Sequence, residues 1–239
     1  MGRLFLVRHA QASFLSNNYD QLSALGETQA RLLGEHWARR KMVFDRVATG
    51  PALRHRRTSE IVSKAYQESG LEFPATVVMQ EFDEFQADAV MSEGLAQLPP
   101  RDAEIRRMQE AFERASEEAE KRKTFQRLFE AVAAKWVQGE IAGDSAETWQ
   151  EFCGRVNRGL SLFLAGARKG EVAAIFTSGG PISVCVQRAL QLSAPETLRV
   201  AWMSRNCSYS EFLFSGDRVT LSTFNSFPHL DEEALLTYR

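Results

Sequence analysis

The stretch LFLVRHAQAS, residues 4–13, decides the fold, because an unbroken apolar run at residues 4–7 stops abruptly at Arg8 and His9. A short apolar run of this kind predicts a strand that is buried on both faces, as in a parallel sheet. Three further short segments are predicted as strands, at residues 43–49, 77–82 and 172–177, and the last of them also reads as buried. Helical segments separate these runs, and strands that alternate with helices indicate a layered α/β fold.

The segments between the strands carry apolar residues at helical spacing. In residues 22–40, Ala30, Leu33 and Trp37 recur at intervals of three and four and form one apolar face. Helices are also predicted at residues 53–68, 151–167 and 181–192. A terminal hairpin is predicted from residues 209–214 and 218–224. We therefore expect an α/β fold of three layers, a mainly parallel sheet flanked by helices.

One region interrupts this alternation. Residues 99–140 are rich in Glu, Arg, Lys, Ala and Gln, and no Gly or Pro occurs between Arg101 and Gln138. This composition predicts one or two long helices with a charged, solvated face. Because it lies between two sheet-forming regions, we expect a single domain over residues 1–239 with an inserted helical cap at about residues 86–142. The cap is expected to choose the substrate.

Composition narrows the range of partners. The chain of 239 residues is 44% hydrophobic and 25% charged, with a net charge of −2. This balance gives no long-range attraction to nucleic acid or to an anionic membrane. No segment approaches the roughly 20 apolar residues of a membrane span, and the apolar run before Arg8 is too short for a signal peptide. We expect a cytoplasmic protein that binds neither nucleic acid nor membrane; its oligomeric state is open.

Three predicted strands end in groups that suit an anion. The first ends at Arg8 and His9, the second leads to Arg54 with His55 beside it, and the fourth ends at Ser178 before two glycines. In open parallel sheets, ligands bind at the carboxyl ends of the strands. The backbone N–H groups of a helix that begins there also favour anions. The sequence therefore predicts an anion pocket that contains a histidine.

The chemistry of these groups fits phosphoryl transfer. A neutral imidazole is nucleophilic near pH 7 and can become a phosphohistidine, which assigns His9 as the nucleophile. The forked guanidinium groups of Arg8 and Arg54 can hold the phosphoryl oxygens. A carboxylic acid must protonate the leaving alcohol, and Glu81, at the end of the third predicted strand, is assigned to this step. Asp83 and Glu84 are its alternatives.

Taken together and in order, these motifs resemble the histidine phosphatase superfamily, also called phosphoglycerate mutase-like. LFLVRHAQAS is similar to its opening strand and Arg-His-Gly signature, and LSALGETQA, residues 22–30, to its Leu-Ser/Thr-x-x-Gly-x-x-Gln-Ala helix. The remaining matches are ATGPALRHRRTSEIV at 48–62, MQEFDEF at 79–85 and GDSAETWQEFCGRV at 143–156. The resemblance covers nearly the whole chain apart from residues 86–142, where the family inserts variable cap segments. It implies that Arg54 is the second phosphate-binding arginine and that Glu81 is the proton donor.

The chain departs from this pattern at two positions. Ala10 replaces the glycine after the histidine, a small change that is expected to preserve the turn. Ser178 stands where the family has its second core histidine. A serine hydroxyl can donate one hydrogen bond but carries no charge, so catalysis is expected to be weakened by about tenfold to a hundredfold. Alternatively, His55 or a water fills the gap.

The sequence therefore predicts a metal-independent phosphomonoester hydrolase that acts through a phosphohistidine on His9. Arg8, Arg54, Ser13 and Ser178 are the expected phosphate-binding residues, Glu81 is the expected acid, and no metal or cofactor is implied. The expected partner is a small phosphorylated substrate. Two alternatives stay open: a phosphomutase of the same fold, and a non-catalytic phospho-ligand-binding member, for which Ser178 is the main support.

Overall fold

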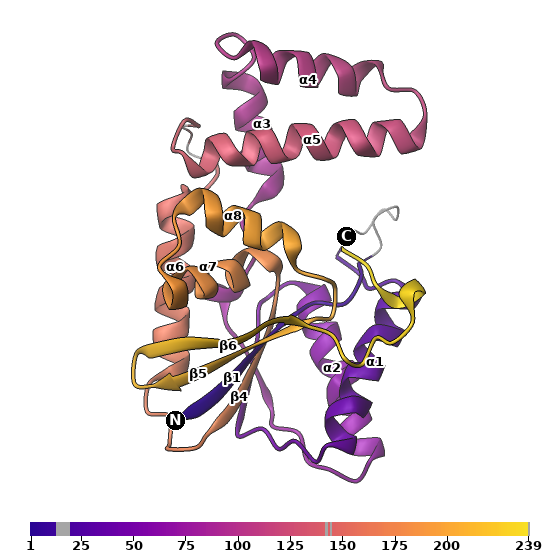
Figure 1. Cartoon of the computed structure of the whole chain (residues 1–239), viewed down its shortest axis with the longest axis vertical. Helices are drawn as coiled ribbons and strands as arrows, with labels where there is room; N and C mark the ends of the chain where they lie inside the picture. The colour runs from indigo at the N-terminus through magenta and orange to yellow at the C-terminus, as the bar shows by residue number, and fades with distance from the viewer. Residues whose placement is uncertain (13–19, 142, 144, 239) are drawn as a thin grey trace. The chain divides into compact units, whose positions relative to one another are not determined.

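The computed structural model describes residues 1–12, 20–141, 143 and 145–238; Ser13, one of the predicted phosphate-binding residues, lies outside them. The chain divides into two compact units. The first unit comprises residues 1–84 and 155–239, and the second comprises residues 85–154. Figure 1 traces the elements of both units along the chain.

The first unit is built on one six-stranded sheet with the order β3-β2-β4-β1-β5-β6. The strands are β1 (Gly2–Arg8), β2 (Arg46–Thr49), β3 (Thr76–Val78), β4 (Val172–Thr177), β5 (Tyr209–Ser215) and β6 (Arg218–Ser226). The first four are parallel, and β5 and β6 form an antiparallel hairpin that continues the sheet beside β1. The predicted α/β fold with a mainly parallel sheet flanked by helices is confirmed.

Helices cover both faces of this sheet (Figure 1). On one face lie α1 (Ala24–Arg39) and α2 (Leu53–Glu68); on the other lie α7 (Gly179–Leu190) and the C-terminal part of α6 (Trp149–Leu164). α8 (Ala194–Met203) contacts α7. Successive side chains of a strand point to opposite faces, so β1 is apolar on both: Leu4, Phe5, Leu6 and Val7 are all buried. This burial accounts for the unbroken apolar run of residues 4–7.

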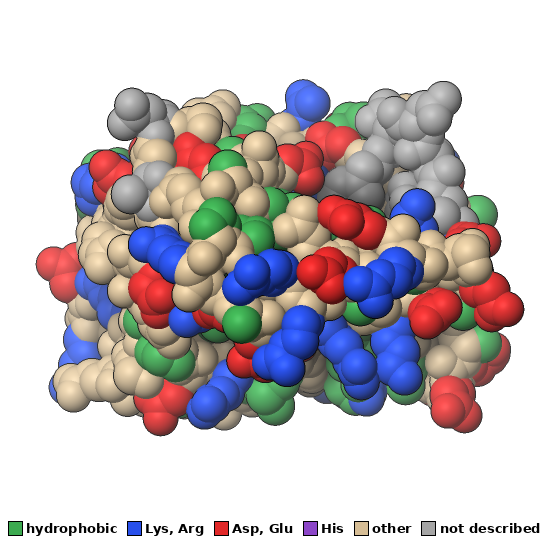
Figure 2. Space-filling model, turned by 90° about the horizontal axis from the view of Figure 1, so that it is seen from above, with side chains coloured by type: hydrophobic (Ala, Val, Ile, Leu, Met, Phe, Trp, Pro, Cys, Tyr) green, Lys and Arg blue, Asp and Glu red, His purple; other side chains and the backbone are tan. Residues whose placement is uncertain are grey.

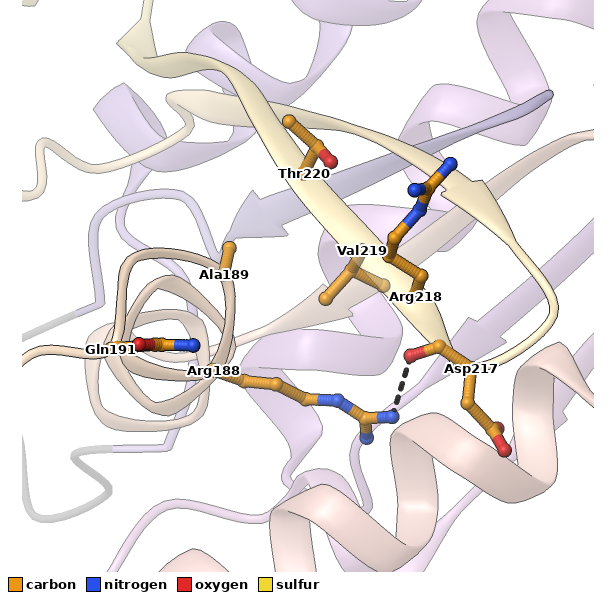
Figure 3. A pocket seen from close by; sticks show the side chains of 7 residues that line it. All are labelled: Arg188, Ala189, Gln191, Asp217, Arg218, Val219 and Thr220. Atoms are coloured by element: carbon orange, nitrogen blue, oxygen red, sulfur yellow. Dashed lines mark hydrogen bonds between the residues drawn. The ribbon is translucent and has the colours of Figure 1, made fainter.

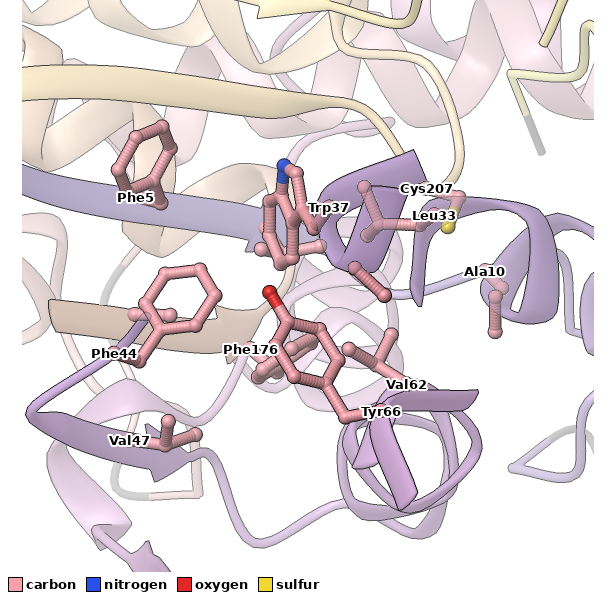
Figure 4. Close-up of a cluster of buried hydrophobic side chains, with 14 residues drawn as sticks. Phe5, Ala10, Leu33, Trp37, Phe44, Val47, Val62, Tyr66, Phe176 and Cys207 are labelled. Carbon is pink, nitrogen blue, oxygen red and sulfur yellow. The ribbon is translucent and has the colours of Figure 1, made fainter. Parts of the chain in front are cut away.

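The face covered by α1 and α2 holds an aromatic cluster (Figure 4). Trp37 lies edge-on to Phe5 with a centroid separation of 5.9 Å, and Phe44 meets the same Phe5 ring at 5.9 Å. Tyr66 is fully buried, and its hydroxyl donates to the Met42 carbonyl at 3.0 Å. Edge-to-face pairs of this kind stabilise a core by about 0.5–1.5 kcal/mol beyond their buried area. The cluster anchors α1 and α2 on the sheet.

The second unit is helical. It contains α3 (Ala87–Gln97), α4 (Ala103–Arg114), α5 (Glu118–Val137) and the start of α6. Its core is aromatic, with Phe85 stacked on Trp136 at 4.9 Å and Phe152 meeting Phe85 edge-on at 5.8 Å. On the surface, i,i+4 ion pairs such as Arg114–Glu110 and Arg122–Glu118 line α4 and α5. Figure 2 shows basic and acidic side chains intermixed on the face that it presents.

The structure differs locally from the sequence expectations, and the second strand, expected from residue 43, begins only at Arg46. The third strand ends at Val78, and Glu81 lies in a 3₁₀ turn, Gln80–Phe82, so the expectation that Glu81 ends a strand is wrong. α3 precedes residues 99–140, where one or two long helices are expected and where α4 and α5 lie. α8 was not predicted, although its capping box of Ser193 and Glu196, with Pro195 in the first turn, is a readable start signal.

The structure also bears on the membrane expectation: among the described residues, no helix has both the length and the apolar character needed to cross a bilayer.

The C-terminal segment contributes a buried histidine that makes folding sensitive to pH. Burial, helped by the nearby His36, lowers the pKa of His229 to about 3. The unfolded chain binds a proton there below about pH 6.5 and the folded chain does not, so stability falls as the pH drops below that value. We expect the free energy of unfolding to fall by about 1 kcal/mol more in the parent than in His229→Gln between pH 7 and 5.5.

Urea unfolding followed by tryptophan fluorescence measures this difference. Parallel pH curves for the two proteins would contradict the assignment, whatever the difference in their absolute stabilities.

Candidate active site

The carboxyl ends of three parallel strands meet because of their register. Arg8 of β1 pairs with Thr177 of β4, and Thr49 of β2 pairs with Phe176 of the same strand. Two backbone hydrogen bonds extend this register into the loops: the His9 N–H donates to Thr177 O, and the Gly50 N–H donates to Phe176 O. The segments that lead to His9, Arg54 and Ser178 therefore leave the sheet side by side.

His9 is held as a neutral imidazole with a defined tautomer. The residue is 5% exposed, and its Nδ1 lies 2.8 Å from the Ala10 carbonyl oxygen. A carbonyl only accepts, so Nδ1 carries the proton and Nε2 carries a free lone pair. Burial lowers the pKa of His9 well below its usual value, and the charges of Arg54 and Arg8 lower it further. The site therefore presents an unprotonated nitrogen beside two cations.

The loop after β1 is fixed from three sides. The Ala10 N–H donates to Thr58 Oγ1 at 3.1 Å, and the same hydroxyl donates to Arg54 O at 2.7 Å, which links the loop to α2. The Gln11 N–H donates to the Gln29 side-chain oxygen on α1 at 2.9 Å. The His9 carbonyl accepts from the Cys207 N–H at 3.1 Å. The position of His9 therefore depends on contacts from α1, α2 and the segment before β5.

The two predicted arginines are held differently. Arg8 is buried, and its Nη1 donates to the Ser204 carbonyl at the end of α8. Arg54 lies in the first turn of α2, where Asp20 contacts it twice: Oδ1 accepts from Arg54 Nη1 at 2.8 Å and from its N–H at 3.3 Å. Asp20 Oδ2 also accepts from the Leu53 N–H at 2.7 Å. Asp20 thus caps α2 and orients the Arg54 side chain.

Ser178 lies at the N-cap of α7, as expected for a residue at the end of β4. Its hydroxyl oxygen is 2.6 Å from His55 Nε2 and 3.5 Å from Arg54 Nη2. His55 is fully buried, and its ring centroid lies 5.6 Å from that of His9. The structure therefore brings a second histidine next to the serine at which the family resemblance expects one.

Three carboxyl groups follow β3 in close succession. Glu81 is half-buried, and its side chain lies against α6: a Cβ added at Gly159 would come within 2.4 Å of Glu81 Cβ. Burial raises the pKa of Asp83 above its ordinary value, although the charges of Arg54 and Arg155 oppose the shift. Glu84 instead accepts from the Gly180 N–H at 3.1 Å. Glu84 is therefore engaged at the start of α7, and Asp83 is within the electrostatic reach of Arg54.

The structure thus assembles Arg8, His9, Arg54 and Ser178, which the sequence singled out. Sequence reasoning missed Asp20 and Thr58 as supports of the site, and named His55 only as a neighbour that fills the gap. Thr58 had a readable signal, since it follows Arg54 by four residues and so faces the same side of a helix. Asp20 had none, because an isolated acid in a loop has no pattern.

A separate hollow lies at the other end of the sheet (Figure 3). It has a volume of about 320 Å³ and contains none of the predicted site residues. Arg188 crosses it, donating to Asp217 O at 2.8 Å and to Ser161 Oγ at 3.0 Å. Because Arg188 donates to other parts of the chain, we interpret it as a structural residue.

The family model of the histidine phosphatase superfamily (branch 1) matches residues 4–127 and 95–226, which together span most of the chain. The chain belongs to the histidine phosphatase superfamily. The comparison with curated proteins gave no match.

Several solved structures share the fold of this chain at low sequence identity. A mycobacterial glucosyl-3-phosphoglycerate phosphatase bound to inorganic phosphate aligns with a TM-score of 0.61 and 19% identity, covering 96% of this chain and 99% of its own. Phosphoglycerate mutase from Bacillus anthracis gives 0.61 and 16%, with coverages of 96% and 95%. A mutant phosphoserine phosphatase from Entamoeba histolytica in complex with phosphoserine gives 0.61 and 18%, with coverages of 96% and 100%.

The Asp20–Arg54 ion pair makes a prediction about anion affinity. An anion bound at Arg54 would meet the negative charge of Asp20, and Asp20→Asn removes that charge while keeping an oxygen to cap α2. We expect Asp20→Asn to bind orthovanadate roughly threefold to tenfold more tightly than the parent. Titration calorimetry measures the change.

Asp45→Asn is the matched control. Asp45 also pairs with an arginine, Arg168, at 3.0 Å and accepts a backbone N–H, that of Val172, at 2.9 Å, but it does so at the start of β4. Unchanged affinity in Asp20→Asn, or an equal gain in both variants, would refute a local effect on Arg54.

Proposed function

We propose that this protein is a phosphomonoester hydrolase in which His9 forms a phosphohistidine. The observation that carries this proposal is the tautomer of His9: its Nδ1–H donates to Ala10 O, which leaves the Nε2 lone pair available beside Arg8 and Arg54. A neutral, oriented imidazole among cations is suited to attack an anionic phosphoryl group. Membership of a superfamily with phosphatase and mutase relatives supports the same reaction class.

The proposed reaction has two steps. The Nε2 lone pair of His9 forms a bond to phosphorus while the bond from phosphorus to the leaving oxygen breaks, and an acid donates its proton to that oxygen. Water then attacks phosphorus, the P–N bond breaks, and the same group, now a base, takes the proton from water. The net reaction consumes one water and releases an alcohol and phosphate, and it needs no redox partner.

The arginines supply the charge that this reaction needs. Arg8 and Arg54 are proposed to hold the non-bridging oxygens, where charge remains high throughout phosphoryl transfer. Ser178, next to Arg54 Nη2, is proposed as a neutral donor to the same group. Ser13 keeps its proposed role as a further donor. The small phosphorylated molecules named for the relatives make a compound of this kind the proposed substrate, with the inserted helices as the proposed determinant of its identity.

The nucleophile is tested by trapping the intermediate. With a ³²P-labelled substrate, quenched parent protein should carry an acid-labile, base-stable label, and His9→Ala should carry none. Turnover should fall by roughly a thousandfold or more in His9→Ala, because the covalent route is lost.

His36→Gln is the control for removing a buried histidine, and it should keep the label. Full turnover in His9→Ala would overturn the mechanism. A parent protein that binds phosphate but never turns over would favour the non-catalytic alternative, and return of the label to a bound product alcohol would favour a mutase.

The acid is tested through the leaving group. A proton donor matters most when the leaving alcohol is a poor one, so Glu81→Gln should slow an alkyl phosphate by roughly a hundredfold or more while changing p-nitrophenyl phosphate much less. Steady-state kinetics on both substrates checks this.

Asp83→Asn is the matched comparison, because burial raises the pKa of Asp83 and so favours its protonated form. If Asp83→Asn shows the selective loss and Glu81→Gln slows both substrates equally, the acid is Asp83 and the assignment to Glu81 is wrong.

A further inference from the structure

The closest contact of the Ser178 hydroxyl is with a histidine from another element. His55 Nε2 on α2 lies 2.6 Å from Ser178 Oγ at the start of α7, and both residues are buried. The His55 ring is also 5.6 Å from the His9 ring, centroid to centroid. A second imidazole is therefore part of the pocket, and it touches the proposed phosphate-binding serine rather than replacing it.

The fold makes room for this ring. A Cβ added at Gly50 would lie 2.4 Å from His55 Nδ1 and 2.5 Å from Phe82 O, so a glycine is needed at the end of β2 for His55 to turn inward. Arg54, His55 and Ser178 therefore lie together at the carboxyl ends of the parallel strands. The inward position of His55 is a specific arrangement and not the solvated helix face that its basic neighbours would suggest.

The surroundings of the ring select its tautomer. Within the described part of the chain, Nδ1 is buried without a hydrogen-bond partner, while Nε2 faces the serine oxygen. A buried N–H without an acceptor is rarer in proteins than an acceptor without a donor. The proton of the neutral ring therefore lies on Nε2 and is donated to Ser178 Oγ.

The hydrogen bonds that the Ser178 oxygen accepts limit where its own O–H can donate. The oxygen has two lone pairs and one proton. His55 Nε2 donates to one lone pair at 2.6 Å, and Arg54 Nη2 approaches the other at 3.5 Å. The hydroxyl proton must then be donated elsewhere, and the anion held by Arg54 is the acceptor that the proposed function supplies.

We propose that His55 is a positioning residue that turns the Ser178 hydroxyl into a directed donor for the bound phosphoryl group. This inference rests on the proposed function and deepens it. Burial, with the charge of Arg54, lowers the pKa of His55 well below its usual value, so the ring stays neutral and acts through hydrogen-bond direction. His55 thus acts on the phosphoryl group through the serine hydroxyl, which supplies a neutral hydrogen bond and no charge.

The first experiment is a double-mutant cycle of His55→Ala, Ser178→Ala and the double variant, read as orthovanadate affinity and as kcat and KM for one phosphomonoester. Each single change should weaken vanadate binding and kcat/KM by roughly threefold to tenfold, the cost of one neutral hydrogen bond. The double variant should lose no more than the worse single, because both changes remove the same donor. Additive losses would overturn the proposal.

Two conservative variants separate hydrogen bonding from ring volume. The amide of Gln can place an N–H where His55 Nε2 lies, whereas the shorter Asn reaches only to the level of Nδ1. His55→Gln should therefore keep most of the parent's vanadate affinity, and His55→Asn should resemble His55→Ala. Equal loss in both would show that only the packing of the ring matters, and would overturn the proposal. Ser59→Ala is the control for deleting a buried hydroxyl on α2, since its partner is Thr76 at 3.1 Å.

A swap tests the same geometry from the other side. Ser178→His alone would bring a second ring against His55, so we expect turnover to fall. His55→Ala/Ser178→His gives the new ring room, so turnover should recover to at least the parent's level. If Ser178→His alone raises turnover, His55 does not occupy that space and the proposal fails.

The inference and the proposed function can fail separately. If the parent shows no turnover on any phosphomonoester, the proposed function fails, while the vanadate cycle still decides the role of His55. If the parent turns over and His55→Ala matches it in kcat, KM and vanadate affinity, the inference fails and the function stands. Thermal unfolding of every variant identifies a folding defect, and His55→Gln then carries the decision.

Discussion

The site depends on the parallel pairing of β1 with β4. That pairing places Arg8 opposite Thr177, and the next hydrogen bond, from the His9 N–H to Thr177 O at 2.8 Å, fixes where the chain leaves the sheet. Ser178 follows Thr177 directly and is the N-cap of α7. Since β2 pairs with the other side of β4, the segment that leads to Arg54 starts there too. One backbone register thus gathers an imidazole, two cations and a hydroxyl.

The charge balance of this pocket follows from burial. Burial disfavours the charged forms of His9 and His55, and the nearby arginine charges disfavour them further. Both imidazoles therefore stay neutral. The neutral His9 ring keeps an unprotonated nitrogen, which the proposed phosphoryl transfer requires, and the neutral His55 ring keeps one N–H to donate. Asp20 provides the opposing charge at Arg54, at the edge of the pocket, where its carboxylate also caps α2.

Local patterns predicted most of the framework. The helix expected at residues 53–68 is α2, Leu53–Glu68, and the terminal hairpin lies where it was expected. These elements are governed by periodicity and turn residues that a short window of sequence contains. The third strand is shorter than predicted, because Phe82 lies outside the sheet, buried in a 3₁₀ turn. The Phe82 carbonyl accepts a hydrogen bond from Thr177 Oγ1, a long-range contact that the local sequence does not reveal. Because of this turn, Glu81 does not lie at the end of a strand, and Asp83 is an alternative candidate for the proposed acid.

The sequence by itself determined that Arg8 and His9 end a buried strand and that Arg54 begins a helix, since burial and helical period are properties of neighbouring residues. Only the tertiary structure decided that His55 turns inward while Arg56 and Arg57 do not, because that depends on how α2 meets Gly50 and β4. His55 and Ser178 are 123 positions apart and share one hydrogen bond. A contact of that range arises when the sheet aligns its strand ends, and no local pattern contains it.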